Sequence, residues 1–355
     1  WLFCGRYGVF GSKVDWISQH SVFPDYFRQQ FYDTGDFFPE FAAGIGGGQN
    51  IYNFAYYGLY SPVFLLSYLL PFVKMSDYLI AASFTCLASA VVLLYFWLIK
   101  RGFSQTVSFL TALLFLLSAP MIFQSYNQIM FVNYMPFLCM ALWGVDSFLE
   151  KGKPLLYLSG VFLMIMTSFY FSIGGILVLI LYGLHRYFML QDSLGKKIRF
   201  LDFLRDGIRF LGPILTVLIA GLAWKRRGER ILIWSTILIL TIPFFSYLLN
   251  GGLYIRDKVL IPFLPVLCYL IACYMQKQQE EARPLWRGLL PYILTIILIF
   301  TGNTESMPSF SRFLLALDVV IMAGCYLLFY ELTRFGIRTN RKSLRTGSVL
   351  CLLIP

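Results

Sequence analysis

Most of the chain repeats one pattern, in which a continuous apolar run is followed by a short polar segment that is mostly basic. A helix that rises about 1.5 Å per residue needs around 20 apolar residues to cross about 30 Å of hydrocarbon. The strands of a transmembrane barrel would instead alternate in short segments. The pattern therefore predicts an all-α, polytopic transmembrane bundle of about nine to eleven membrane helices. The predicted spans are residues 78–99, 106–123, 131–149, 155–170, 172–188, 231–249, 259–275, 285–301 and 313–332.

The first part of the chain is polar, aromatic and rich in glycine. Within it, residues 61–72 are apolar but too short to span a membrane, and Pro62 and Pro71 bracket them. This run predicts an interfacial or re-entrant helix. We therefore expect two parts, a long extracytoplasmic first loop at residues 1–77 and a transmembrane helical bundle at residues 78–355.

The two ends of the chain also carry information. It starts at Trp1 and stops at Pro355, inside a new apolar run that begins near Val349. We therefore expect the bundle to be truncated at both ends and the chain to be a piece of a longer protein.

Composition and charge agree with a membrane protein. Hydrophobic residues make up 58% and charged residues 13%, whereas soluble domains have about 45–50% and about 25%. The net charge of +11 is the excess of Lys and Arg expected in cytoplasmic loops, so membrane lipids and not nucleic acid are the expected surroundings. Of the 29 basic residues, 22 lie in alternate loops, and placing these loops in the cytoplasm puts residues 1–77 outside.

One region does not fit this orientation. Residues 202–224 have basic blocks on both sides but hold only one moderately apolar run. Either this run is re-entrant around Pro213, or a crossing that the orientation requires is missing. The sequence leaves both alternatives open.

Few residues could hold a metal ion or work inside the membrane. The seven cysteines form no CxxC motif and the chain has two histidines, so no metal ligand is predicted and the cysteines are expected to be buried free thiols. Asp146 and Asp318 are the only acids well inside predicted spans, and each lies near a helix end. We interpret them as interfacial or snorkelling groups, which lowers the weight of a proton-driven transporter.

The candidate chemistry gathers in the first loop. Asp15 stands close to an indole and to polar side chains, and a carboxylate near the membrane surface could act as a general base. Gln19, His20 and Asp25 follow it and could orient Asp15 or a substrate. The alternative for Asp15 is an ordinary solvated loop acid.

Three further features could bind substrate. A glycine run at residues 44–48 could bring backbone N–H groups against a phosphate, or could be a flexible turn. The aromatic cluster after it, including Tyr56 and Tyr57, could stack on sugar rings or form an interfacial aromatic belt. Arg256 and Lys258 lie in a loop predicted to be outside and could hold a lipid phosphate, or could pair with a neighbouring acid or a headgroup.

Several long polar motifs within this hydrophobic chain resemble the bacterial YfhO family. They are Asp15-Trp-Ile-Ser-Gln-His20, Asp25-Tyr-Phe-Arg28, Gly46-Gly-Gly-Gln-Asn-Ile-Tyr-Asn-Phe-Ala-Tyr-Tyr57, Ser61-Pro62, Asn133-Tyr134-Met-Pro136, Ser168-Phe-Tyr170-Phe and Asn250-Gly-Gly-Leu-Tyr-Ile-Arg-Asp-Lys-Val-Leu-Ile-Pro-Phe-Leu-Pro265. That family is similar to the GT-C glycosyltransferases, whose catalytic acid lies in the first extracytoplasmic loop. The resemblance implies a GT-C-like bundle in a bacterial plasma membrane, with its active site facing outside and Asp15 as the catalytic carboxylate.

The resemblance further implies the reaction. An inverting enzyme would move a sugar from a polyprenyl-phosphate donor to a cell-envelope acceptor such as teichoic or lipoteichoic acid. Asp15 would be the base, and Arg256 and Lys258 would stabilise the departing phosphate. The resemblance establishes no particular cofactor, and a divalent metal is left open. The rivals are a transporter or flippase of a lipid-linked glycan and a non-catalytic scaffold for envelope assembly.

Overall fold

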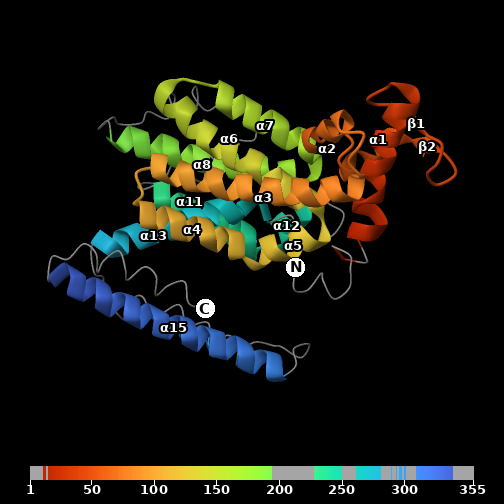
Figure 1. Ribbon diagram of the computed structural model, residues 1–355. Coiled ribbons are helices and arrows are strands. Elements are labelled where there is room, and N and C mark those ends of the chain that lie inside the picture. Colours follow the sequence, from red (N-terminus) through yellow and green to blue (C-terminus); the bar gives the residue numbers. More distant parts are fainter. Residues whose placement is uncertain are drawn as a thin grey trace. The chain divides into compact units, whose positions relative to one another are not determined.

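The computed structural model describes residues 11–12, 15–193, 228–249, 261–280 and 309–338, with five helical positions between 289 and 300. These residues are almost entirely helical, which confirms the prediction of an all-α protein (Figure 1). The helices are the π-helical turn η1 (Trp16–His20), α1 (Val22–Thr34), the 3-10 turn η2 (Ile51–Tyr57), α2 (Pro62–Leu66), the 3-10 turn η3 (Ser67–Leu69), α3 (Met75–Lys100), α4 (Gln105–Leu117), α5 (Ala119–Asn127), α6 (Ile129–Lys151), α7 (Leu155–Thr167), α8 (Phe169–Ser193), α11 (Gly228–Thr241), α12 (Pro243–Leu249), α13 (Leu264–Glu280) and α15 (Ser309–Arg338).

Three of the described helices are long and apolar enough to cross a membrane, namely α3, α6 and α8. A fourth span is present if the bent pair of α4 and α5 counts as one. This supports a membrane helical protein, and the number of nine to eleven spans stays a prediction because part of the chain is not described. The apolar window of α6 is 83% buried within the protein, against 33% for α3, so α6 is a central helix and α3 a peripheral one.

Two predicted spans end earlier than expected. The span at 106–123 is divided at Ser118, whose backbone is extended and precedes Pro120 at the start of α5. Proline restricts the residues before it and removes a backbone donor, so a continuous helix is disfavoured there. The span at 155–170 stops at Thr167, because Ser168 is extended. The Ser168 hydroxyl oxygen accepts a hydrogen bond from the backbone N–H of Phe171 at 3.4 Å, which satisfies a donor in the first turn of α8.

The first loop folds around a small core of its own. Helix α1 packs against η1, η2 and η3, and the two-residue strands β1 (Phe41–Ala42) and β2 (Gln49–Asn50) form an antiparallel hairpin. Helix α2 and the turn η3 together cover residues 62–69 of the apolar run predicted at 61–72, and they are far too short to span. Leu66, Leu69 and Phe72 are exposed on this part, which fits a segment that meets lipid. The buried side chains of the core are Phe27, Ala42, Ile51, Phe54, Leu59 and Tyr68.

The described chain divides into two compact units. The larger one holds residues up to Leu94 and Leu116–Leu267, and includes the first loop, α6, α7 and α8. In the smaller one, the ring of Trp97 stacks on Tyr269 at 5.6 Å, and the backbone N–H of Ser104 donates to Gln276 Oε1 at 3.3 Å. This second unit also carries the long helix α15.

Within the larger unit, α6 packs most extensively against α7, and α8 also packs on α6 (Figure 1). Two glycines permit the close approach of α6 and α7. A Cβ atom added at Gly144 would lie 2.5 Å from the backbone of Tyr157, and one at Gly160 would lie 2.7 Å from the backbone nitrogen of Ala141. Small residues allow membrane helices to approach in this way, since packing replaces the hydrophobic effect between helices in lipid.

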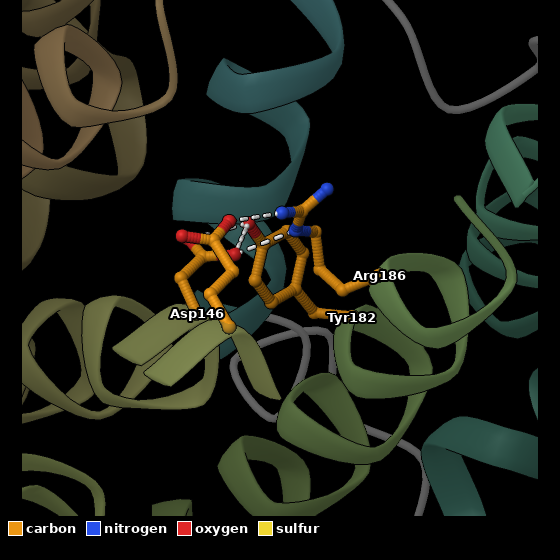
Figure 2. Close-up of polar contacts among 4 residues, drawn as sticks. Asp146, Tyr182 and Arg186 are labelled. Atoms are coloured by element: carbon orange, nitrogen blue, oxygen red, sulfur yellow. Dashed lines mark hydrogen bonds and ion pairs between the residues drawn. The ribbon is translucent and has the colours of Figure 1, made fainter. Parts of the chain in front are cut away.

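A buried ion pair joins α6 to α8 near their C-terminal ends. Arg186 Nε lies 2.6 Å from Asp146 Oδ1, and the Tyr182 hydroxyl donates to the same carboxylate at 2.9 Å. Figure 2 shows both side chains of α8 turned toward Asp146. Arg186 also pairs with Glu150 at 2.5 Å. Asp146 is therefore a paired buried group and not a snorkelling one, and the spacing of four residues on each helix was the signal for this cluster. The side chain of Asp318 lies outside the described part.

The glycine contacts predict that a change to alanine lowers the melting temperature at some glycines and not at others. Gly144→Ala or Gly160→Ala should lower the melting temperature of the detergent-solubilised protein, because overpacking against a backbone costs about 1–3 kcal/mol. Gly324→Ala is the matched control, since nothing lies within 4 Å of the added Cβ. It should leave the melting temperature unchanged or raise it, because alanine favours a helix over glycine by about 1 kcal/mol. Equal effects of all three changes would show that α6 and α7 do not approach closely.

The ion pair leads to a second prediction. Arg186→Met should destabilise the protein by about 3–5 kcal/mol, because it leaves the buried Asp146 carboxylate without its cation. The double change Arg186→Met with Asp146→Leu should recover much of this loss, since no buried charge is then left unpaired and Glu150, the other partner of Arg186, is exposed to solvent. Chemical unfolding in detergent measures both. A double variant no more stable than Arg186→Met alone would contradict the pairing.

Candidate functional site

Asp15 is placed by the residues on either side of it. The Trp16 ring is buried and packs in a cluster with α3 and α6 residues. The backbone N–H of Ser12 donates to the carbonyl oxygen of Tyr126 at 3.0 Å, close to the end of α5. Gly11 has a φ of 99°, and a Cβ atom there would lie 2.1 Å from the Trp16 ring, so only glycine allows this fold of the chain. Asp15 is thereby held beside the junction of α5 and α6.

Gln128 occupies that junction and contacts Asp15 directly. It is the single residue between α5 and α6, with an extended backbone at φ −143° and ψ 106°. Its side-chain nitrogen Nε2 donates to Asp15 Oδ2 at 2.7 Å, across 113 residues of sequence. Gln128 was not among the residues predicted from the sequence. The sequence does show a polar residue at the expected outer end of a span. A polar residue at that place does not by itself indicate which distant segment it contacts.

His20 and Tyr57 lie next to this pair. The His20 ring is buried, and its centre is 5.9 Å from that of Tyr57. Tyr57 also contacts Phe23, with 4.4 Å between ring centres. Burial raises the pKa of the Tyr57 hydroxyl, and the negative charge of Asp15 raises this pKa further. Tyr57 is therefore a protonated donor near Asp15 at neutral pH.

Tyr56 connects this group to the start of α8. Its ring lies edge-on to Tyr57 at 5.2 Å and edge-on to Tyr170 at 5.6 Å, and Phe169 is 6.5 Å away. Aromatic rings from η2 and α8 therefore form a continuous group, which we call the aromatic wall: Tyr56, Tyr57, Phe169 and Tyr170. Tyr170 and Phe169 belong to a motif noted in the sequence, but their proximity to Tyr56 follows only from the fold.

The other predicted residues have different surroundings. The backbone N–H of Gln19 donates to the carbonyl oxygen of Asp15 at 3.0 Å, within η1. The Asp25 side chain is 62% exposed and pairs with Arg28 at 3.4 Å, one turn along α1. Arg256, Lys258 and the region 202–224 lie outside the described residues. The structure thus brings together Asp15, His20, Tyr56 and Tyr57.

The glycine run forms the turn of the β1–β2 hairpin. Gly46, Gly47 and Gly48 all have positive φ angles, which side chains of L-amino acids rarely adopt. The Phe41 ring lies against Gly48, where a Cβ atom would be 2.6 Å from it. This geometry agrees with the turn interpretation of the run, and its use as a phosphate cradle stays a prediction.

The described residues hold no group of three or more His, Cys, Asp or Glu side chains placed to bind a metal ion. Cys86, Cys139 and Cys268 are buried cysteines outside any disulfide, as expected, and Cys273 is half-buried. A role for a divalent metal stays untested.

Comparison with known proteins identifies the family. The model of the bacterial membrane protein YfhO matches residues 8–223, which is more than half of the 355 residues. The match includes Asp15, Gln128, the aromatic wall and the ion pair of α6 and α8. No curated protein and no solved structure matches the chain significantly. The chain belongs to the YfhO family of bacterial membrane proteins.

Proposed function

We propose that this protein is a membrane glycosyltransferase. It moves a sugar from a polyprenyl-phosphate donor to a hydroxyl group of an extracytoplasmic cell-envelope polymer, such as teichoic or lipoteichoic acid. The observation that carries the proposal is the environment of Asp15, a half-buried carboxylate held by Gln128 and flanked by Tyr57. Family membership and the spanning helices support a membrane-bound substrate.

Asp15 has the geometry of a general base. Its Oδ2 atom accepts the hydrogen bond from Gln128, while its Oδ1 atom accepts none from the part of the chain that is described. A base must lie within hydrogen-bond reach of the proton that it takes. One oxygen thus holds the carboxylate in place, and the other is left for the hydroxyl of the acceptor.

The reaction is a single displacement with inversion. The acceptor oxygen forms a bond to the anomeric carbon, and the bond from that carbon to the phosphate oxygen breaks. Asp15 takes the proton of the acceptor hydroxyl, and polyprenyl phosphate leaves with the bonding electrons. We assign Arg256 and Lys258 to the phosphate, because guanidinium and ammonium groups bind phosphate oxygens well.

The aromatic wall suits the sugar. Aromatic rings present large, rigid apolar faces together with polar hydroxyl groups, which is the combination that a sugar ring and its hydroxyls require. Tyr57 adds a protonated hydroxyl donor beside Asp15. We propose that Tyr56 and Tyr57 bind the donor sugar, and that Tyr170 extends the same aromatic surface beside Tyr56. His20 and Gln19 support η1, and Asp25 has a lesser role because it faces solvent.

The central test replaces the proposed base. Asp15→Asn in the full-length protein should slow sugar transfer about 10²–10⁴-fold, which is the usual contribution of a general base. The sugar content of teichoic acid should fall as a result. The measurement is the sugar content of teichoic acid in cells that lack the protein, after rescue with each variant at equal expression. Rescue by the wild type alone supports a transferase with Asp15 as its base.

Asp33→Asn is the matched control for this experiment. Asp33 is an exposed carboxylate of α1 in the same loop, and its Oδ1 atom accepts a hydrogen bond from Gln29 Nε2 at 3.0 Å. It should rescue as well as the wild type. If Asp15→Asn also rescues fully, then Asp15 is not the base, and a transporter or scaffold explains the protein better.

A further inference from the structure

Gln128 has an amide group of which only one end is satisfied. Its Nε2 atom donates to Asp15, as described above. Its Oε1 atom is buried and accepts no hydrogen bond from the described residues. A buried acceptor without a partner costs about 1–3 kcal/mol. A residue that served only to tie two segments together would gain nothing from this cost.

The orientation of this amide follows from chemistry. An ionised carboxylate only accepts hydrogen bonds, so the NH₂ end of the amide must face Asp15. Turning the amide over would place two oxygens against each other and would lose the 2.7 Å hydrogen bond. The unsatisfied atom is therefore the carbonyl oxygen, which requires a donor such as a hydroxyl group.

The position of this oxygen connects it to the reacting centre. It belongs to the residue that touches the proposed base, at the same junction of α5 and α6. The Gln128 residue as a whole is half-buried, so a ligand bound at Asp15 lies next to this amide while Nε2 keeps its hydrogen bond to Asp15. A hydroxyl next to the reacting atoms would reach it when the reacting hydroxyl is at Asp15.

We propose that Gln128 is a specificity-determining residue: its Nε2 atom orients Asp15, and its Oε1 atom accepts a hydrogen bond from a substrate hydroxyl adjacent to the reacting centre. This inference rests on the proposed transferase function and deepens it. The hydroxyl belongs either to the donor sugar, on the carbon next to the anomeric carbon, or to the acceptor, next to the attacking oxygen. Both sources have the same chemistry, and substrate analogues distinguish them.

The experiment measures transfer by the purified full-length protein in vesicles. The donor arm compares a polyprenyl-phosphate hexose with its 2-deoxy analogue. The acceptor arm compares poly(ribitol phosphate), which has neighbouring hydroxyls, with poly(glycerol phosphate), which has one free hydroxyl in each unit. The wild type should lose on the order of tenfold in kcat/KM when the recognised hydroxyl is removed, because a hydrogen bond contributes about 0.5–1.5 kcal/mol.

Gln128→Leu should be slower on every substrate and should show no further loss when that hydroxyl is removed. A merely structural role would slow both substrates by the same factor and would keep the tenfold difference. Gln124→Leu, one turn earlier on α5, is the matched control and should keep both the wild-type rate and the difference. Loss of the difference on the donor arm assigns the hydroxyl to the sugar, and loss on the acceptor arm assigns it to the polymer.

Gln128→Glu tests the contact with Asp15 without changing the size of the side chain. Two carboxylates at this distance share a proton, so the pKa of the pair rises and the rise of activity with pH should move up by at least one pH unit. The other described titratable groups next to Asp15 are Tyr57 of η2 and His20 of η1, and both remain in the variant. An unchanged pH profile would overturn the positioning role.

The outcomes separate the two proposals. If the wild type transfers sugar and Gln128→Leu keeps whichever tenfold difference the wild type shows, this inference is wrong while the transferase function stands. If the wild type transfers no sugar, the proposed function is wrong and this inference falls with it. A thermal melt of each variant shows that it is folded, and Gln128→Glu supplies a near-isosteric variant should Gln128→Leu be unstable.

Discussion

Trp16 is 3% exposed and lies in an apolar cluster that joins three separate parts of the larger unit. Val63 and Phe64 come from α2, Met75 and Leu79 from α3, and the α6 residues from its first turns. A tryptophan side chain buries a large apolar area, which offsets part of the entropy lost when the segment around it is ordered. This burial holds the first loop on the helical part, and the position of the neighbouring Asp15 depends on it.

Helix α6 then separates two polar clusters that have different roles. Gln128 precedes the helix and Asp146 lies 18 residues later, a rise of about 27 Å. That length is close to the thickness of the hydrocarbon core. At one end, the Asp15 Oδ1 atom and the Gln128 Oε1 atom accept no hydrogen bond from the described residues. At the other end, Arg186 pairs with Asp146 and Glu150, and the cluster stabilises the packing of α6 on α8.

Much of this arrangement could be predicted because it depends on local properties. Long apolar runs predicted α3, α6 and α8, since the cost of crossing lipid depends on the residues of each run alone. The short run at 61–72 was predicted not to span for the same reason. The break at Ser118 was missed, and the turn between the predicted spans 155–170 and 172–188 lies slightly earlier than expected, at Ser168. Hydropathy averages over a window and does not register which backbone groups a proline or serine can satisfy.

The sequence by itself determined the class of the protein, the main spanning helices and the residue types that could do chemistry in the first loop. Only the tertiary structure decided which of these residues meet. It placed Asp15 against Gln128 and Tyr56 against Tyr170, and it buried Asp146 in an ion pair. Hydropathy and helix propensity act over neighbouring residues, whereas a contact across 113 residues depends on the packing of every element between its two ends.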